Sequence, residues 1–282
     1  MSVDGATLRY VIEGSGIPTL VIGSAIYYPR TFSQQLREAF RLAFVDVRHF
    51  AEIDASCTLD NITLDTYTDD IEQARAKVGF ERVVVVGHSH HGNLALEYAK
   101  RYPAAVSHTV LIGSPPCDLK TTIEAGNAYW SEHASEARKA ALRDNWAALS
   151  SEILEAMPTE DAYVAQYVAD GPKYWYDHNY NASSLWQGVP VNMDIIRVFR
   201  DFFADYELSW NPERMRAPVL VIVGRHDYVV PHSLWKEVLP KLRNVTFSVF
   251  DRSGHAPQLE EPELFNRVLL EWIGRSSALG VV

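Results

Sequence analysis

Residues 83–96 read VVVVGHSHHGNLAL and contain the clearest structural signal in the chain. Four consecutive valines that end at a glycine are typical of a strand buried on both faces, and the apolar residues from position 94 onward recur at the spacing of a helix. Only a sharp turn fits between strand and helix. Gly87 and Gly92 flank this turn, and their lack of side chains lets the helix approach the strand and strain the backbone of Ser89 between them. We therefore expect the Ser89 hydroxyl to be a nucleophile exposed above the end of the strand.

Three histidines around Ser89 raise the alternative of a metal site, because hydrolytic metalloenzymes often use two histidines separated by one residue. They are His88, His90 and His91. A dinuclear H-x-H-x-D-H motif would need Asp at position 92 and His at position 93, where this chain has Gly92 and Asn93. We therefore predict no metal site and supporting roles for the three side chains. The backbone N–H of His90 falls at the start of the helix, where an anion is stabilised.

Composition and charge limit the classes of function. The 282 residues are 47% hydrophobic, which is enough for one large α/β domain with an insertion. A formal net charge of -10 argues against nucleic-acid and membrane partners, which require a basic patch, and favours a neutral or moderately apolar small molecule. The first residues lack the features of a signal peptide, and we expect a cytoplasmic protein, monomeric or homodimeric. Cys57 and Cys117 lack metal-binding spacing and are expected to be ordinary thiols.

Strand-like and helix-like segments alternate along most of the chain, which predicts a mostly parallel sheet flanked by helices. We expect strands at residues 19–22, 42–46, 83–86, 109–112, 218–223 and 245–250, and helices at 32–40, 65–78, 94–102, 234–242 and 261–274. Residues 8–12 and 19–22 are expected to form an antiparallel hairpin, and residues 51–63 a loop.

Residues 117–210 differ from the rest because they are helix-like and rich in aromatic side chains. We expect a helical cap there, inserted into an α/β core made of residues 1–116 and 211–282. Cap residues that face Ser89 should be apolar if they line a pocket. The aromatic residues expected at this pocket are Tyr27, Tyr28, Trp130, Trp175 and Trp186, although packing within the cap explains many such side chains equally well.

Two further polar residues follow predicted strands in the way that Ser89 does. Asp227 comes directly after the strand at 218–223, and His255 follows the next strand along the chain. A serine hydroxyl needs a base within hydrogen-bond reach, and the base needs an acceptor that fixes its tautomer. Ser89 is the expected nucleophile, His255 the base and Asp227 the acceptor, so their order along the chain is nucleophile, acid, histidine. Asp118 and Asp251 are alternative acids that lack the strand-end context.

With these motifs the chain resembles the α/β-hydrolase superfamily, within it the capped group of esterases, lactonases, carbon-carbon bond hydrolases and proline iminopeptidases. The resemblance implies an oxyanion hole made by the backbone N–H of His90 and of a residue after the first central strand. Counting along the loop places Ala25 there, with Ser24 as the neighbouring option. The loop departs from the family, which usually has His-Gly where this chain has Gly23 and Ser24.

The resemblance and the triad together predict a serine hydrolase of small to medium carboxylic esters or lactones, such as acyl-homoserine lactones, with no cofactor. An aminopeptidase or amidase is the second hypothesis. It requires a cap carboxylate near the leaving amine, for which the candidates are Glu124, Glu132, Glu160, Asp161 and Asp194. A third hypothesis is a non-catalytic small-molecule receptor, because hydrolase folds are also used for binding. An intact triad argues against the receptor.

Overall fold

The computed structural model of the chain describes residues 1–206 and 215–278. Its centre is a seven-stranded sheet in the order β10-β9-β8-β7-β4-β5-β3. The strands are β3 (Tyr10–Glu13), β4 (Ile17–Gly23), β5 (Phe40–Asp46), β7 (Val83–His88), β8 (Val106–Ile112), β9 (Val219–Gly224) and β10 (Val245–Phe250). All neighbouring pairs are parallel except β3 and β5, which are antiparallel. The predicted mostly parallel α/β sheet is confirmed.

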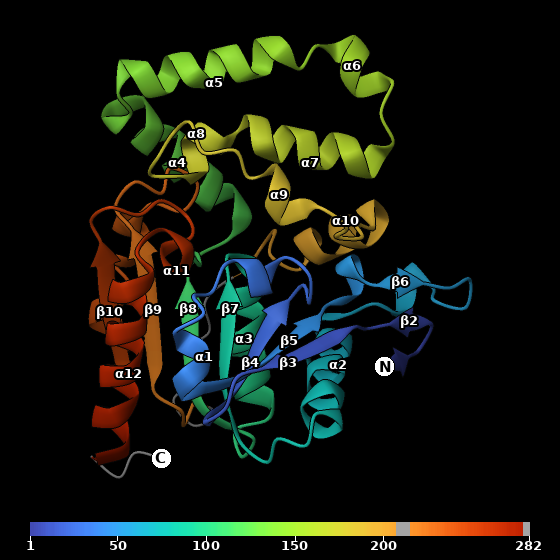
Figure 1. Ribbon diagram of the computed structural model, residues 1–282, viewed down its shortest axis with the longest axis vertical. Coiled ribbons are helices and arrows are strands. Elements are labelled where there is room, and N and C mark those ends of the chain that lie inside the picture. The colour runs from blue at the N-terminus through green and yellow to red at the C-terminus, as the bar shows by residue number, and fades with distance from the viewer. Residues whose placement is uncertain (207–214, 279–282) are drawn as a thin grey trace.

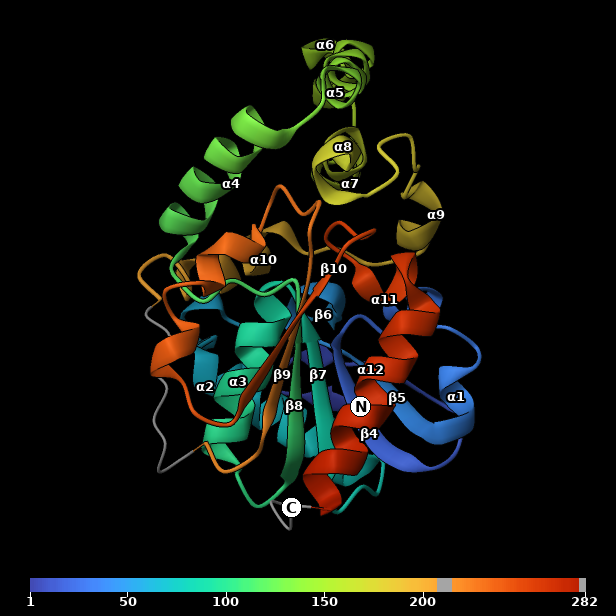
Figure 2. The same ribbon diagram turned by 90° about the vertical axis from the view of Figure 1, so that its left-hand side faces the viewer.

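The strand β7 lies inside this sheet, which explains why its sequence is apolar on both faces. Its four valines are at most 1% exposed. Helices cover both faces, with α2 (Leu64–Lys77) and α3 (His90–Arg101) on one side and α1 (Leu36–Ala39) and α12 (Pro262–Ala278) on the other (Figure 2). The parallel strands all end at the same edge, so the loops that follow them gather there, as in other open α/β sheets.

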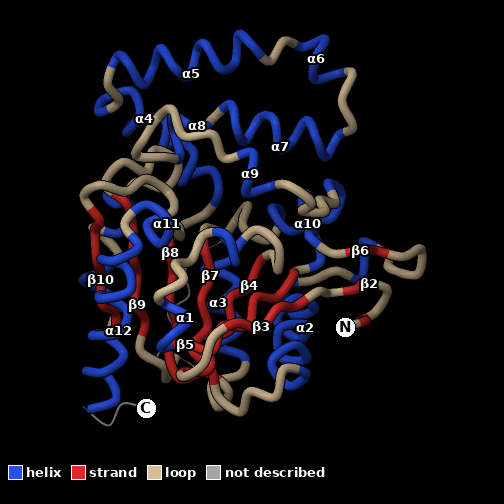
Figure 3. Tube along the Cα trace, in the orientation of Figure 1, coloured by secondary structure: helices blue, strands red, loops and turns tan. Residues whose placement is uncertain are grey.

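A helical cap lies over this edge of the sheet (Figure 1). It contains α4 (Leu119–His133), α5 (Glu136–Ala148), α6 (Ser151–Glu155), α7 (Thr159–Ala169), α8 (Gly171–Tyr174), α9 (Ser183–Trp186) and α10 (Met193–Asp201). The described residues 113–206 contain no strand, and Figure 3 shows the cap as helices and loops alone. Several of these helices begin at an N-cap residue whose side chain accepts a backbone N–H of the first turn, for example Asp118 at α4 and Ser135 at α5. The predicted end of the cap, at residue 210, lies outside the described residues.

Three predictions about individual elements were wrong. The expected hairpin does not form, because β4 is already paired on both edges with β5 and β7, and β3 pairs instead with the free edge of β5. The expected helix at 234–242 consists of two short 3₁₀ turns, η4 (His232–Trp235) and η5 (Leu239–Lys241), and Pro240 within it removes a helical N–H. Gly274 does not end α12, which continues to Ala278; a side chain at Gly274 would meet open space.

The first residues and part of the predicted 51–63 loop form a small second sheet. Its strands are β1 (Ser2–Val3), β2 (Ala6–Thr7) and β6 (Glu52–Ile53). Three 3₁₀ turns, η1 (Tyr28–Arg30), η2 (Arg48–Phe50) and η3 (Leu59–Asn61), and the short helix α11 (Pro257–Glu260) complete the core. Among the helices that the structure describes, none combines the length and apolarity needed to cross a bilayer.

Candidate active site

The turn between β7 and α3 holds Ser89 in a strained conformation, with φ 55° and ψ -135°. A positive φ is uncommon for residues other than glycine and marks positions where structure over-determines the backbone. The Ser89 N–H donates to the carbonyl oxygen of Ile112 at the end of β8, at 2.8 Å. The neighbouring strand thus anchors the turn and lifts the Ser89 side chain above the sheet.

The two glycines that flank Ser89 are required by close packing. A Cβ on Gly87 would lie 2.1 Å from the carbonyl oxygen of His91, and a Cβ on Gly92 would lie 1.8 Å from Oγ of Ser114. Both distances are far shorter than real carbon contacts. Glycine at position 87 therefore lets the helix approach the strand, and glycine at position 92 leaves room for the Ser114 side chain.

Asp227 and His255 form a buried pair next to this turn. Nδ1 of His255 lies 2.7 Å from Oδ2 of Asp227, and the Asp227 side chain is completely buried. The other carboxylate oxygen accepts hydrogen bonds from the backbone N–H groups of Val229 and Val230, at 2.9 and 2.8 Å. These bonds fix the carboxylate, which in turn fixes the imidazole so that Nε2 is the nitrogen free to act on a substrate.

Ser89 and His255 line the same cavity, which has a volume of about 370 Å³ and is called here the catalytic cavity. No hydrogen bond joins the Ser89 hydroxyl to His255, both of which lie in the described part of the chain. Such bonds are often long without substrate and tighten only in the complex. The sequence correctly placed the three residues at the same edge of the sheet.

The two alternative acids occupy other positions. Asp118 caps α4, where its Oδ1 accepts the N–H of Thr121 at 2.8 Å. Asp251 forms an exposed ion pair with Arg225. Neither carboxylate is placed to hold His255.

The floor of the catalytic cavity is formed by four polar side chains of the core: Tyr28, His49, His88 and His91. They belong to one chain of hydrogen bonds. Nε2 of His88 lies 2.8 Å from the carbonyl oxygen of His255, and the Tyr28 hydroxyl lies 3.2 Å from Nδ1 of His88 and 3.0 Å from Nδ1 of His91. Nε2 of His91 then meets Nε2 of His49 at 3.0 Å, and Nδ1 of His49 meets the hydroxyl of Tyr67 at 2.9 Å.

The carbonyl oxygen of His255 at one end of this series of hydrogen bonds fixes the direction of all of them. A carbonyl oxygen only accepts, so His88 donates from Nε2 to His255, and the neutral ring then accepts from Tyr28 at Nδ1. The same logic makes His91 donate to Tyr28, His49 donate to His91, and Tyr67 donate to His49. Burial keeps the rings neutral, since it lowers the pKa of His88 and of His49 to about 3. The floor therefore connects His88 and His91, which precede and follow Ser89 in the chain, to the backbone of His255.

The roof of the catalytic cavity is formed by four aromatic side chains of the cap: Tyr163, Tyr167, Tyr174 and Trp186. These meet mainly through ring contacts, such as the 4.5 Å between the ring centres of Tyr167 and Tyr174. Of the predicted pocket residues, Tyr27, Tyr28 and Trp186 line the cavity. Trp130 and Trp175 do not: Trp130 packs on Tyr228, and Trp175 is 1% exposed and packs on Tyr180.

The predicted second oxyanion donor needs correction. The backbone N–H of Ala25 donates to Oδ1 of Asp46 at 2.7 Å, so it is already occupied. Ser24, the alternative, is completely buried, and its Oγ accepts the N–H groups of Ile26 and Tyr27. His90, in contrast, is the first residue of α3, and its N–H has no acceptor within the helix.

Several residues of the site were missed in the sequence. His49 and Tyr67 carry no motif, because their roles depend on contacts between segments far apart in the chain. Arg200, on α10, is the only lysine or arginine among the described residues that line the catalytic cavity. In the sequence, Arg200 is marked only as a cationic residue near the end of an amphipathic helical segment of the cap.

The cap is bonded directly to the backbone of His255. The N–H of His255 donates to the carbonyl oxygen of Tyr174, at the end of α8. Arg138, on α5, donates to the carbonyl oxygens of Pro172, Trp175 and Tyr176 on either side of this contact. The half-buried carboxylate of Glu260 accepts hydrogen bonds from the N–H groups of Tyr176 and Gly254.

Comparison with known proteins agrees with this architecture. Residues 15–262 match the family model described as the alpha/beta hydrolase fold, and the chain belongs to this family. It is similar to the AB hydrolase superfamily protein YclE of Bacillus subtilis, with 36% identity over 272 residues that cover 96% of both chains. It is also similar to a 2-hydroxy-6-oxononadienedioate/2-hydroxy-6-oxononatrienedioate hydrolase of Paraburkholderia phymatum, with 26% identity over 96% of this chain and 93% of the relative. The solved structure of proline iminopeptidase from Mycobacterium smegmatis superposes with a TM-score of 0.67 at 19% identity, covering 97% of this chain and 95% of that one, which shows a shared fold.

Proposed function

We propose that this α/β hydrolase is a serine carboxylic ester hydrolase that acts on small to medium esters, including lactones. The proposal depends above all on one observation. Ser89 lies at a strained turn in the same cavity as His255, whose other ring nitrogen is held by the buried carboxylate of Asp227.

The proposed reaction follows from these positions. Oγ of Ser89 attacks the ester carbonyl carbon while Nε2 of His255 takes the hydroxyl proton, and Asp227 stabilises the resulting imidazolium. The oxyanion lies near the N–H of His90 at the start of α3. His255 then gives its proton to the leaving alcohol as the carbon-oxygen bond breaks. Water hydrolyses the acyl-enzyme by the same steps and releases the acid.

The charges of the catalytic cavity support an ester more than a peptide with a free amino terminus. Capturing an amino terminus requires a carboxylate, and no Asp or Glu is among the described residues that line the cavity. The candidates Glu160 and Asp161 line a different space in the cap. Arg200 at the cavity instead suits a substrate that carries an anionic group, as the dioate in the name of the Paraburkholderia relative does.

Hydrolysis of p-nitrophenyl acetate and butanoate by the wild type and by Ser89→Ala tests the proposal. We expect the variant to lose on the order of 10⁴-fold or more in kcat, because attack by the serine is lost. Ser131→Ala, at an exposed hydroxyl on α4, is the matched control and should keep full activity. Turnover that persists in Ser89→Ala would reject the serine mechanism. Cleavage of proline p-nitroanilide without ester turnover would favour the peptidase instead.

A further inference from the structure

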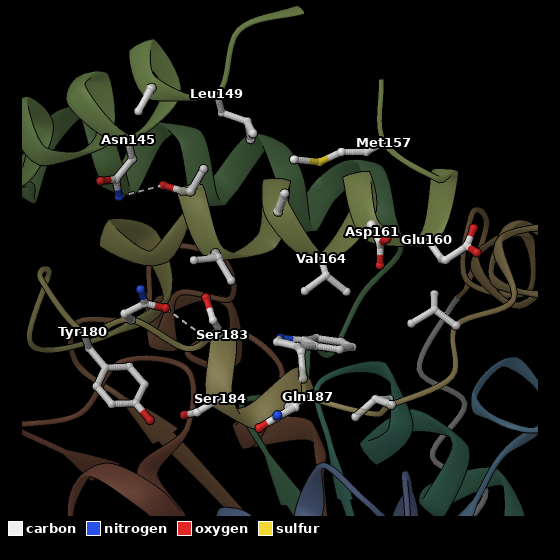
Figure 4. A pocket seen from close by; sticks show the side chains of 18 of the residues that line it. Asn145, Leu149, Met157, Glu160, Asp161, Val164, Tyr180, Ser183, Ser184 and Gln187 are labelled. Carbon is white, nitrogen blue, oxygen red and sulfur yellow. Dashed lines mark hydrogen bonds between the residues drawn. The ribbon is translucent and has the colours of Figure 1, made fainter. Parts of the chain in front are cut away.

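Trp186 separates the catalytic cavity from a second, larger space in the cap, and its side chain lines both. The second space, called here the cap groove, has a volume of about 1140 Å³. Figure 4 shows Val164 of α7 on one side of it and Ser183 and Gln187 of the α9 segment on the opposite side. The two spaces therefore share a wall at the end of α9.

The lining of the cap groove suits an aliphatic chain. Ten of its 21 lining residues are polar, and nine are aliphatic or methionine and provide the apolar part of the lining: Ala148, Leu149, Met157, Val164, Ala165, Val168, Ala169, Val189 and Val191. The carboxylates of Glu160 and Asp161 lie next to each other at one end of the groove (Figure 4). A tail that ends in an anionic group would be repelled there, whereas an uncharged tail would not.

The catalytic cavity alone is small for a long ester. Its volume of about 370 Å³ is near the lower limit of about 300 to 1,000 Å³ typical of small-molecule sites. Two routes by which a longer acyl chain could leave the cavity are indicated by its lining residues. One leads past Trp186 into the cap groove. The other leads to solvent beside Ile123, a cavity residue on α4 that is 48% exposed.

Trp186 is packed among aromatic rings, and its one polar group lacks a partner in the described part of the chain. Its ring lies 4.9 Å from the ring of Tyr27 and 5.1 Å from that of Tyr167, between ring centres. The side chain is only 9% exposed, yet its indole N–H has no hydrogen-bond partner in the described part of the chain. A buried donor without an acceptor is costly, and an acceptor atom of a ligand that passes this point would satisfy it.

The segment that carries Trp186 is short, and one side chain of the core supplies the hydrogen bonds that attach it. The helix α9 has four residues. Nη1 of Arg30 donates to the carbonyl oxygens of Ser184, Leu185 and Gln187, at 3.2, 2.8 and 2.8 Å. A local shift of this segment therefore breaks few hydrogen bonds and mainly requires the buried side chains of Leu185 and Trp186 to repack.

We propose that the cap groove binds the uncharged aliphatic tail of esters too long for the catalytic cavity, and that Trp186 sets the chain length at which the tail crosses between them. This inference rests on the proposed ester hydrolase function. It assigns the groove, and not the opening beside Ile123, as the acyl subsite.

The first test compares kcat/KM for p-nitrophenyl acetate and dodecanoate in variants that block either route. Ala165→Trp fills the groove, Ile123→Trp narrows the solvent opening, and Ala147→Trp on the exposed side of α5 is the matched control. We expect Ala165→Trp to lower the ratio of dodecanoate to acetate at least about tenfold, because each methylene that loses its contacts costs about fourfold. Trp186→Ala should raise the ratio, and Ala147→Trp should not change it. The proposal fails if Ala165→Trp leaves the ratio unchanged or if only Ile123→Trp lowers it.

A second test does not depend on turnover. Calorimetric titration of dodecanoate, the acid product of the p-nitrophenyl ester, into Ser89→Ala measures binding of the tail directly. Adding Ala165→Trp should weaken binding at least about tenfold, and adding Ala147→Trp should not. Equal affinity in all three proteins would reject the groove as the subsite. If no ester is hydrolysed, the proposed function fails, and this titration still decides whether the groove binds an aliphatic chain.

Discussion

Tyr27 and Tyr28 are adjacent in sequence, and both line the catalytic cavity, but the floor and the roof bind their hydroxyl groups differently. The Tyr28 hydroxyl lies between His88 and His91 in the hydrogen-bond chain of the floor. The Tyr27 hydroxyl has only a 3.5 Å approach to Tyr167, while its ring packs on Trp186 of the roof. The floor is thus held by directional bonds and the roof by ring packing. Directional bonds fix the position of the catalytic groups, whereas packed rings can rearrange around substrates of different shape.

The largest expected effect comes from the buried carboxylate of Asp227, which holds His255. In Asp227→Asn the amide donates to Nδ1 of His255 and fixes the wrong tautomer, so kcat should fall on the order of 10⁴-fold with the fold retained. Steady-state kinetics with p-nitrophenyl butanoate, together with a thermal melt, measure this. Asp251→Asn is the matched control, because its exposed ion pair with Arg225 contributes little. A similar loss in both variants would contradict the assignment of Asp227.

Paired Tyr→Phe variants compare floor and roof directly. Tyr28→Phe leaves buried nitrogens of His88 and His91 without partners and should lower the free energy of unfolding by about 2 to 4 kcal/mol. Tyr27→Phe removes one long contact and should cost less than about 1 kcal/mol. Urea unfolding of the two variants gives both values. Equal costs would mean that the hydrogen-bond chain adds nothing to the stability of the floor.

The contact between cap and catalytic loop should depend on pH. Burial raises the pKa of Glu260 from 4.5 to about 7. The folded protein then keeps this proton to higher pH than the unfolded chain, so the stability from this group is complete below about pH 4.5 and is lost as the pH rises to about 7.

Unfolding of wild type and Glu260→Gln between pH 4.5 and 7 measures this contribution. The decline assigned to Glu260 should disappear in the variant, changing the difference between the two proteins by at most about 3 kcal/mol over this range. Glu263→Gln, at an exposed position of α12, should behave as wild type. A difference that does not vary with pH would show that Glu260 ionises alike in both states.

The smallest effect is expected at the roof. Arg30→Ala removes the three hydrogen bonds that attach the α9 segment to the core. Amide exchange of residues 183–188 should become about tenfold faster, equivalent to about 1.4 kcal/mol of local stability, with little change in the global melting temperature. Exchange measured by mass spectrometry tests this, with Arg197→Ala on α10 as the control. Unchanged exchange would mean that ring packing alone holds the segment.

The sequence predicted those parts of the molecule that depend on local pattern. The valine strand, the glycines around Ser89 and the positions of Asp227 and His255 all follow from residues next to one another in the chain. Ala25 was assigned by counting along a loop, and counting cannot reveal that the Asp46 carboxylate accepts its N–H. The predictions for the aromatic residues of the cap were partly wrong for a related reason. Trp130 and Trp186 are the same residue type in helical segments, and only the packing of the cap onto the core distinguishes them.

The contact between Tyr174 and His255 limits how this enzyme can be engineered. A cap inserted between two strands looks like a module that could be removed or exchanged for that of a relative. Here the backbone N–H of His255, the proposed base, donates a hydrogen bond to the cap, and Arg138 holds the accepting segment in place. A chimera that replaces residues 171–176 would therefore alter the base as well as the specificity. Cap exchange should begin after residue 176 and leave this segment with the core.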